Sequence, residues 1–288
     1  MAQEKVLIIG LGQVGHALFE LFKESGRFGV YGLDVDSKRM EQIVGKSEEA
    51  ENIAAMHICY PCAEQQEFVR ITANYIRSLK PKLTIIESTV PPQTTRRIRE
   101  ITNTALVYSP IRGMHKSLET MKKDILFWKK YVGGTTKDAA IAAQEHFQKL
   151  GLQVKLLKSP EEAELAKLFE TTYRAWMITF FQEMHRISRH FGADYNEVVD
   201  MLQDVHIRRF NKPLHYPGII GGHCLIPNTK LLLRSYDSQL LQLIIESNEK
   251  REEEMKDNVV KEEVEKIRYR VEAIEKMIVE RGLRLQDD

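Results

Sequence analysis

The motif at residues 10–15, Gly-Leu-Gly-Gln-Val-Gly, constrains the fold of this chain more than any other stretch. It follows a short apolar run, Lys5 to Ile9, and it precedes a helical pattern of apolar residues. A second apolar run, Gly29 to Leu33, comes next and is followed by Asp34. A glycine-rich turn between a strand and a helix, with a carboxylate after the second strand, is typical of a dinucleotide-binding domain.

Each part of this motif has an expected role toward a cofactor. The first glycine allows a tight turn, the second lets a pyrophosphate approach the backbone, and the third lets helix and strand pack closely. The helix N-terminus supplies N–H groups and the positive end of a dipole to the phosphates. Asp34 is expected to bind the ribose hydroxyls and to repel a 2′-phosphate, which favours NAD over NADP; a nucleotide-free turn is the alternative. The predicted cofactor contacts of the turn are Gly10, Gly12, Gln13, Val14 and Gly15.

Apolar runs continue to alternate with helical patterns as far as residue 158. The further predicted strands are Ile53–Tyr60, Leu83–Ser88, Ala105–Ser109 and Tyr131–Gly133. This alternation predicts an α/β fold, a Rossmann-type doubly wound parallel sheet, over residues 1–158. Cofactor contacts are expected at the carboxyl ends of such strands, where Ser88 and Thr89 offer two hydroxyls near the expected nicotinamide.

Cys59 and Cys62 have the spacing of a metal or redox pair. The sequence has no second such pair to complete a zinc site, so no metal is predicted. A redox role and a coincidence in a strand-end loop are the alternatives. The chain has 3 cysteines, and this odd number argues against a disulfide framework and fits a reducing cytoplasm.

Residues 159–162, Ser-Pro-Glu-Glu, have the pattern of a helix start with a serine N-cap. The helical pattern then runs to Phe191 and stops at Gly192, a rod of about 45 Å. This predicts an all-helical domain over residues 159–237 with a long central helix that is buried between domains. Lys167, Thr171 and Arg174 form one polar stripe on that helix, which is either functional or a solvated face.

Residues 216–228 form a turned loop with three glycines and two prolines, and Cys224 stands in it after Gly-Gly-His. Glycine lets a backbone approach a ligand closely, and a turn rich in N–H groups favours the thiolate form of a cysteine. A thiolate is a nucleophile for a carbonyl carbon. A buried structural cysteine in a glycine-rich turn is the alternative.

Residues 238–288 are dense in charged side chains and form a predicted C-terminal helical segment. Six apolar residues in it are spaced 4, 3, 4, 3 and 4, namely Val260, Val264, Ile267, Val271, Ile274 and Ile278. This heptad seam predicts a helix partner and therefore a homodimer or higher homo-oligomer. A long helix that folds back on its own domain is the alternative.

The composition narrows the possible partners. A formal net charge of +1 gives no electrostatic argument for nucleic acid. The apolar runs are too short to span a membrane, and the N-terminus lacks the apolar region of a signal peptide. We therefore predict a cytoplasmic protein without nucleic-acid or membrane partners.

Taken together, these residues resemble the UDP-glucose/GDP-mannose 6-dehydrogenase family from Lys5 to about Leu233. The resemblance rests on the glycine motif with Asp34 and Arg39, on Glu-Ser-Thr-Val-Pro at 87–91, on Glu-Leu-Ala-Lys-Leu at 164–168 and on Gly-Gly-His-Cys at 221–224. Members of this family oxidise the primary alcohol of a sugar to a carboxylate with two NAD.

The resemblance implies a role for each motif. Cys224 would attack the intermediate aldehyde and form a thiohemiacetal and then a thioester, while Lys167 would stabilise the oxyanion. Thr89 would lie near the nicotinamide and the catalytic water, and Arg208 would reach the substrate, within the chain or across a dimer. The implied substrate contacts are Arg174, Arg208, Gly221, Gly222 and His223.

The sequence departs from the family at three positions, two of which carry a carboxyl group in the family. Thr171 stands in place of an asparagine, Asn228 in place of an aspartate, and Ile111 in place of a glutamate. General acid–base help of the kind these carboxylates give accelerates a reaction by about 10²–10⁴-fold. The charged segment also takes the place of the domain that holds the substrate nucleotide in the family. Two alternatives therefore remain, a two-electron dehydrogenase of a smaller hydroxy compound and an NAD-binding oligomeric scaffold.

Overall fold

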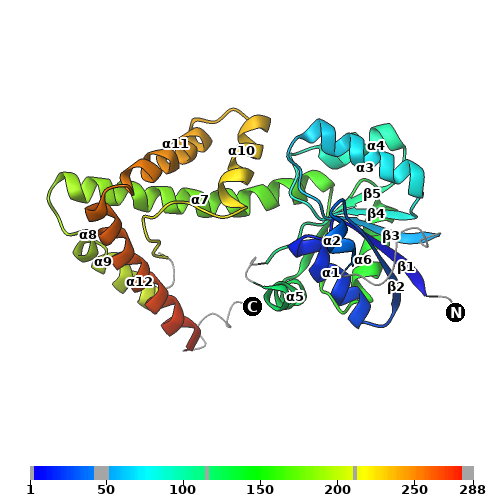
Figure 1. Cartoon of the computed structure of the whole chain (residues 1–288), viewed down its shortest axis with the longest axis horizontal. Helices are drawn as coiled ribbons and strands as arrows, with labels where there is room; N and C mark the ends of the chain where they lie inside the picture. Colours follow the sequence, from blue (N-terminus) through cyan, green and yellow to red (C-terminus); the bar gives the residue numbers. More distant parts are fainter. Residues whose placement is uncertain (1–2, 42–51, 114–116, 210–212, 281–288) are drawn as a thin grey trace. The chain divides into compact units, whose positions relative to one another are not determined.

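The computed structural model describes residues 3–41, 52–113, 117–209 and 213–280 (Figure 1). The chain divides into two compact units, Met1–Leu168 and Phe169–Asp288. The first unit is an α/β sheet domain, and the second is entirely helical in its described residues. Helix α7, Pro160–His190, begins in the first unit and continues into the second.

The first unit contains a seven-stranded sheet in the order β2-β1-β3-β4-β5-β6-β7. β1 pairs in parallel with β2 and β3, and the parallel pairing continues through β4 to β5. β1 lies inside the sheet, with β2 on one side and β3 to β5 on the other. This strand order is typical of a dinucleotide-binding fold. The strands are β1 Glu4–Ile9, β2 Phe28–Leu33, β3 Ile53–Ile58, β4 Leu83–Ile86, β5 Leu106–Tyr108, β6 Lys130–Gly134 and β7 Val154–Leu157.

The prediction of a parallel sheet is confirmed for β1 to β5 and is wrong for β6, which pairs antiparallel with β5. A parallel neighbour requires a crossover that returns the chain to the far edge of the sheet. Helix α5, Leu118–Phe127, instead packs against α1 and ends just before β6, so the chain re-enters the sheet at the edge where β5 left it. The register pairs Tyr108 with Gly133, and Lys130 therefore lies beyond the carboxyl end of β5.

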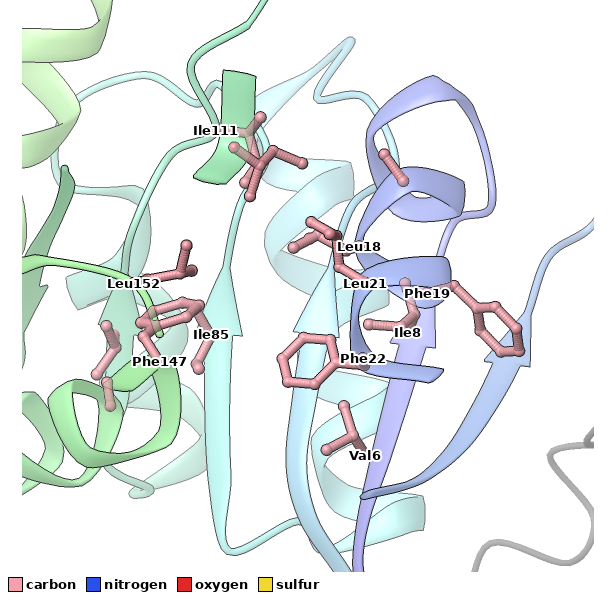
Figure 2. Close-up of a cluster of buried hydrophobic side chains, with 14 of the residues drawn as sticks. Val6, Ile8, Leu18, Phe19, Leu21, Phe22, Ile85, Ile111, Phe147 and Leu152 are labelled. Carbon is pink, nitrogen blue, oxygen red and sulfur yellow. The ribbon is translucent and has the colours of Figure 1, made fainter. Parts of the chain in front are cut away.

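Alternate residues of the strands supply two separate cores, one on each face of the sheet. Val6 and Ile8 of β1 belong to the core under α1, α5 and α6, whereas Leu7 and Ile9 belong to the core on the other face. Figure 2 shows Phe22 of α1 packed close to Val6 and Ile8 in the first of these cores. The predicted double winding is thus confirmed. The helices of this unit, α7 apart, are α1 Gln13–Glu24, α2 Ser37–Glu41, α3 Gln65–Leu79, α4 Thr94–Thr102, α5 Leu118–Phe127 and α6 Lys137–Gln148.

Helix α7 has the start and end that its sequence predicts. The hydroxyl of Ser159 accepts a hydrogen bond from the N–H of Glu161 at 3.2 Å. The helix ends at His190, and Gly192 follows with a φ of +67°, a left-handed conformation that glycine adopts without strain.

The remaining helices of the second unit are α8 Tyr195–Val198, α9 Asp200–Arg209, α10 Leu225–Ser235, α11 Gln239–Glu254 and α12 Asn258–Glu280. The pattern Asp-Tyr-Asn-Glu at residues 194–197 predicts the capped start of one helix that runs through Leu202. The structure instead interrupts the helix at Val199 and continues it to Arg209. The charged C-terminal segment is likewise two helices. They separate where Asp257 caps the second by accepting a hydrogen bond from the N–H of Val259 at 2.8 Å.

The heptad seam of α12 packs inside its own unit. Its five residues from Val260 to Ile274 are at most 8% exposed. Ile267, Val271 and Ile274 form a cluster with Phe181 of α7 and with Tyr195. Ile278 extends the seam along the helix, but its side chain lies outside the described residues. The prediction of a seam for a separate partner helix is therefore wrong, because the turn before α12 folds it back onto α7.

No helix in the described part of the chain is long and apolar enough to cross a membrane.

Candidate functional site

The glycine turn of the first unit is packed against the carboxyl end of β3. Gly10 has a φ of +91°, and a Cβ at this position would lie 2.6 Å from the backbone nitrogen of Tyr60. A Cβ at Gly15 would lie 1.8 Å from the carbonyl oxygen of Gly10. Both positions therefore exclude a side chain, as close packing of the turn, helix and strand requires.

Gly12 differs from its neighbours because space remains around it. Among the described residues, a Cβ at Gly12 would have only the Nη1 of Arg39 within 4 Å, at 3.9 Å. Gly12 is also the N-cap of α1 and has no side chain to cap the N–H groups of Gln13 and Val14 in the first turn. An open backbone at a helix N-terminus suits a phosphate group.

Asp34 lies directly after β2 and is tied to the glycine turn. Its Oδ2 accepts a hydrogen bond from the N–H of Leu11 at 2.6 Å and lies 3.3 Å from the Nη1 of Arg39. Burial raises the pKa of Asp34, but the N–H groups of Asp36 and Leu11 together with Arg39 hold it below its usual value. The carboxylate is therefore charged at neutral pH beside the turn where a dinucleotide ribose would lie.

The two hydroxyls after β4 have different surroundings. The Oγ of Ser88 donates to the carbonyl oxygens of Ile58 and Tyr60, at 3.1 and 2.6 Å, and so joins the ends of β3 and β4. Thr89 is half-buried and stands next to this joint. Ser88 thus has a structural role, and Thr89 is the hydroxyl that remains accessible at this strand end.

A buried polar network lies next to these strand ends, and the sequence reasoning missed it. The carboxylate of Glu87 contacts the Nδ1 of His57 at 3.0 Å and accepts a hydrogen bond from the Nζ of Lys130 at 2.6 Å. Lys130 also donates to the carbonyl oxygen of Ser109 at 2.7 Å, and the Nε2 atoms of His57 and His146 are 3.0 Å apart. All these side chains are buried. A histidine inside the apolar run of β3 was the only local signal.

Burial dominates the electrostatics of this network. It lowers the pKa of Lys130, which Glu87 raises again and which nearby Lys167 lowers further. Burial also lowers the pKa of His146 to about 2, with a smaller effect of His57, so this ring is neutral. The pKa of Cys59 is raised well above its usual value by burial and by Glu87. A protonated Cys59 thiol does not favour the redox role considered for Cys59 and Cys62, neither of which is in a disulfide.

Glu164 begins the motif at residues 164–168 and caps another helix. Its carboxylate accepts hydrogen bonds from the N–H of Gln93 at 2.6 Å, from the N–H of Thr95 at 2.9 Å and from the hydroxyl of Thr95 at 2.7 Å. Burial nonetheless raises the pKa of Glu164 to about 7. This contact fixes the start of α7 to α4 within the first unit, and Lys167 follows one turn later, half-buried.

Cys224 is the N-cap of α10 in the second unit. It is half-buried rather than buried, which does not fit the alternative of a buried structural cysteine. Gly222 before it has a φ of +84°, and no described atom lies within 4 Å of a Cβ built at Gly221 or Gly222. These glycines and His223 are exposed, so the backbone in front of Cys224 is open to a ligand.

The structure brings two predicted catalytic positions together in the second unit. The Nδ2 of Asn228 donates a hydrogen bond to the Oγ1 of Thr171 at 3.2 Å, and both side chains are buried. In the first unit Ile111 is part of an apolar core, as Figure 2 shows. At the three positions where the sequence departs from the family the side chains are therefore uncharged, and Asn228 donates to Thr171.

The predicted substrate arginines have different surroundings. Arg174 lies near His215, whose pKa falls to about 4 through burial and then through the charge of Arg174. Arg208 is exposed and pairs with Asp204 on its own helix at 2.8 Å. The contacts of the described residues do not bring Arg208 to the cysteine loop. The basic segment continues into residues 210–212, which lie outside the described residues.

Among the described residues, no group of three or more His, Cys, Asp or Glu side chains is arranged so that it could hold a metal ion.

Known proteins resemble this chain in sequence and fold. It is 24% identical over 276 residues to the UDP-N-acetyl-D-mannosamine dehydrogenase of Pyrococcus horikoshii, an alignment that covers 80% of this chain and 64% of the relative. The solved structure of UDP-D-ManNAc dehydrogenase from the same organism matches with a TM-score of 0.72 and 21% identity over 86% of this chain and 68% of that one. The 3-hydroxyisobutyrate dehydrogenase of Mycobacterium tuberculosis has a TM-score of 0.65 and 11% identity, covering 93% of this chain and 100% of that one.

The chain thus spans about two thirds of the length of the nucleotide-sugar relative, 64%. A family model described as the central domain of the UDP-glucose/GDP-mannose dehydrogenase family matches residues 161–250. This match contains Lys167, Thr171, Cys224 and Asn228, all of which the resemblance singled out. Residues 161–250 therefore resemble the central domain of the UDP-glucose/GDP-mannose dehydrogenase family, and the chain as a whole resembles a UDP-D-ManNAc dehydrogenase in fold.

Proposed function

We propose that this chain is an NAD-dependent dehydrogenase that oxidises an alcohol group of a nucleotide sugar. The observation that carries the proposal is the family match over residues 161–250, which contains both Lys167 and Cys224. The relatives of the chain that are named for a substrate include enzymes for UDP-N-acetyl-D-mannosamine. The glycine turn with Asp34 supports a dinucleotide site in the same chain.

The residues around the glycine turn fit NAD. The open backbone at Gly12 and the first turn of α1 would hold the pyrophosphate, and Asp34 would hold the ribose hydroxyls. Thr89, half-buried after β4, would lie on the nicotinamide side. Bound there, NAD would accept the hydride that the substrate alcohol loses.

The cysteine would then carry the second oxidation. Loss of a hydride and a proton from the alcohol gives an aldehyde, and the sulfur of Cys224 adds to its carbonyl carbon to form a thiohemiacetal. Lys167 would stabilise the oxygen on which negative charge develops. Loss of a proton and of a second hydride, to a second NAD bound after the first NADH has left, would give a thioester, and water would then release the carboxylate and restore the thiol.

A second candidate is the two-electron oxidation of a smaller hydroxy compound. Two observations favour it. The structural match to a 3-hydroxyisobutyrate dehydrogenase covers 100% of the chain of that enzyme. The Thr171–Asn228 pair also lacks the carboxylate that thioester hydrolysis would use, whereas a single hydride transfer needs no hydrolysis.

We also infer that the protein forms a homodimer or higher homo-oligomer, through α7 rather than through α12. Four large apolar side chains on α7 are exposed although they recur at helical spacing along one face, namely Phe169, Tyr173, Phe180 and Ile187, and the exposed Phe191 follows just after the helix. Soluble proteins rarely leave such a stripe in contact with water. A second copy would present the same stripe, which is the requirement of a two-fold interface.

We also infer a cytoplasmic location, because the chain has 3 cysteines, an odd number that fits a reducing compartment.

NADH formation separates the candidates. The chain is incubated with NAD and, in turn, with UDP-N-acetyl-D-mannosamine, UDP-glucose, GDP-mannose and 3-hydroxyisobutyrate, and absorbance at about 340 nm is followed, the usual NADH signal. NADH with a nucleotide sugar supports the proposal, and NADH with the hydroxy acid alone supports the second candidate. NAD binding without any NADH would instead support a scaffold.

A further inference from the structure

The second unit contains a cavity that the proposed reaction does not use. Its volume is about 400 Å³, and it is lined by the last turns of α7 and α11 and the beginning of α12. Four permanent cations line it, Arg186 and Arg189 from α7 and Lys250 and Arg251 from α11. Glu254 supplies a carboxylate at its wall. A cavity with this excess of positive charge attracts anions.

Internal ion pairs neutralise only part of this charge. The Nε of Arg186 contacts both oxygens of Glu254, at 2.9 and 3.1 Å, and its Nη1 lies 3.0 Å from Glu183. The Nε of Arg189 lies 3.4 Å from the carboxylate of Glu263, a longer contact, and each of these two side chains is 38% exposed. Lys250 makes no ion pair or side-chain hydrogen bond with any residue that the structure describes.

Arg251 is the buried member of the group, and its hydrogen bonds are incomplete. Its side chain is 0% exposed, and its Nη2 donates to the carbonyl oxygen of Gln182 at 3.0 Å. Within the described part of the chain, its Nε has no hydrogen-bond partner; Glu254 lies 3.3 Å away but outside hydrogen-bond geometry. Burial lowers the pKa of Arg251 to about 10, and Glu254 offsets this only in part.

The helix ends account for some of these cations but not for the cavity. Positive side chains near a helix C-terminus are favourable by about 0.3–1 kcal/mol each, and α7 and α11 both end here. That effect is also present when a side chain points into solvent. It does not explain why a guanidinium is completely buried at the wall of an open space with one N–H unsatisfied.

We propose that this cavity binds a small molecule with at least two phosphate charges, held by Arg189 and Lys250, while the buried charge of Arg251 adds to the positive potential. The planar fork of Arg189 matches two phosphate oxygens at once, and Lys250 adds a point charge. Glu254 acts as an internal anion that competes with the ligand for Arg186. The proposal concerns the second unit alone and does not depend on the proposed dehydrogenase activity.

Calorimetric titration of the whole chain with inorganic diphosphate, at constant ionic strength set by chloride, tests the site. We expect one site per chain. Lys250→Ala and Arg189→Ala each weaken binding by about tenfold, the effect of losing one charge-assisted hydrogen bond. Glu254→Gln tightens binding, because it removes the competing carboxylate. Lys256→Ala, an exposed lysine that pairs with Glu253 outside the cavity lining, leaves binding unchanged.

The nucleotide turn of the first unit also suits a diphosphate, and a separate variant distinguishes the two sites. Gly12→Ala fills the open backbone position of that turn, where a Cβ has room. Diphosphate binding that survives Gly12→Ala supports the cavity, and binding that disappears assigns the diphosphate to the turn and overturns the proposal. An affinity for diphosphate that is the same in Lys250→Ala, Arg189→Ala and Glu254→Gln as in the unchanged chain also overturns the proposal. The absence of any binding overturns it too. Circular dichroism of each variant establishes that it is folded.

Discussion

The side-chain amide of Asn228 donates a hydrogen bond to the hydroxyl of Thr171 at 3.2 Å, and both side chains are buried. The two residues come from α10 and α7, which are distant in sequence, so their contact is a property of the folded second unit. Each group satisfies the other, and neither can hold a negative charge at neutral pH. A thioester formed at Cys224 would therefore lack a nearby base from this pair to activate the water that hydrolyses it.

This pair predicts the effect of Asn228→Asp. With a nucleotide sugar, we expect the unchanged chain to give a burst of NADH and then a slow steady state, limited by hydrolysis of the thioester. A carboxylate at residue 228 would serve as a base and accelerate the slow phase by about 10²-fold, the lower limit of general-base effects. Stopped-flow absorbance measures both phases. Thr171→Val is the control, since it breaks the same hydrogen bond without adding a base. A slow phase that Thr171→Val accelerates as much as Asn228→Asp would contradict the explanation.

Cys224 is expected to be the most reactive of the 3 cysteines. It is half-buried at a helix N-terminus, whereas Cys62 is buried and the pKa of Cys59 is raised by burial. Alkylation with iodoacetamide near pH 7, followed by mass spectrometry of each cysteine peptide, should label Cys224 at least about tenfold faster than the others. Equal rates for Cys224 and Cys59 would remove the basis for a thiol mechanism.

Glu164 should make the stability of the first unit depend on pH. Its pKa is raised from 4.5 to about 7 in the folded chain by burial, so the folded state binds the proton more tightly than the unfolded state. The resulting stabilisation is fully present below pH 4.5 and is lost as the pH rises through 7. The loss amounts to about 3 kcal/mol, from about 1.4 kcal/mol for each pKa unit.

Urea unfolding between pH 5 and pH 8 measures this slope. Trp128 of the first unit reports on the transition once Trp176 of the second unit is replaced by Phe. Glu164→Gln should flatten the slope. Glu161→Gln is the control, because the pKa of Glu161 is lowered, mainly by Arg96 and Ser159 against the effect of burial, and its titration falls below this range. A stability that rises with pH would mean that the three hydrogen bonds to Glu164 outweigh its burial.

Asp34 should set the choice of cofactor. Its carboxylate is charged beside the glycine turn, so it attracts ribose hydroxyls and repels a 2′-phosphate. We expect NAD to bind at least about tenfold more tightly than NADP in calorimetric titrations, and Asp34→Asn to narrow that ratio. Asp36→Asn, which removes a neighbouring carboxylate that also pairs with Arg39, should leave the ratio unchanged. Equal affinities for the two cofactors in the unchanged chain would refute this assignment.

The exposed apolar stripe of α7 predicts the effect of a charge on assembly. Phe180→Arg places two guanidinium groups opposite each other in a two-fold interface and should reduce the mass measured by light scattering to that of one chain. Tyr236→Arg changes an equally exposed aromatic residue away from α7 and should not alter the mass. If both variants and the unchanged chain have the same mass, α7 does not mediate association.

Local signals in the sequence were sufficient for part of this structure. The glycine turn, the strand before it and the serine cap of α7 each depend on residues within a few positions of one another, and the structure has all three. The antiparallel direction of β6 depends instead on how α5 packs against α1, which no short pattern contains. The turn between α11 and α12 has neither glycine nor proline, and only the capping carboxylate of Asp257 marks it.

The buried polar network around Glu87 could not be predicted from the sequence for the same reason. The network joins His57 of β3, Lys130 of β6, His146 of α6 and Glu87 just after β4, and its contacts join residues up to 89 positions apart. Only the fold puts these strand ends next to one another. The Thr171–Asn228 pair could be suspected because both positions depart from the family, but the hydrogen bond between them requires the packing of α10 against α7.

The measurement that tests the central claim most directly is the number of NADH molecules formed per molecule of UDP-N-acetyl-D-mannosamine in the presence of excess NAD. A four-electron oxidation through Cys224 predicts two NADH and a carboxylate product, and mass spectrometry should detect an acyl adduct on Cys224 that Cys224→Ser abolishes. Formation of one NADH with an aldehyde or ketone product would contradict the role of Cys224 as the nucleophile. If this substrate, UDP-glucose and GDP-mannose all give no NADH while NAD binds, the proposed function itself is wrong.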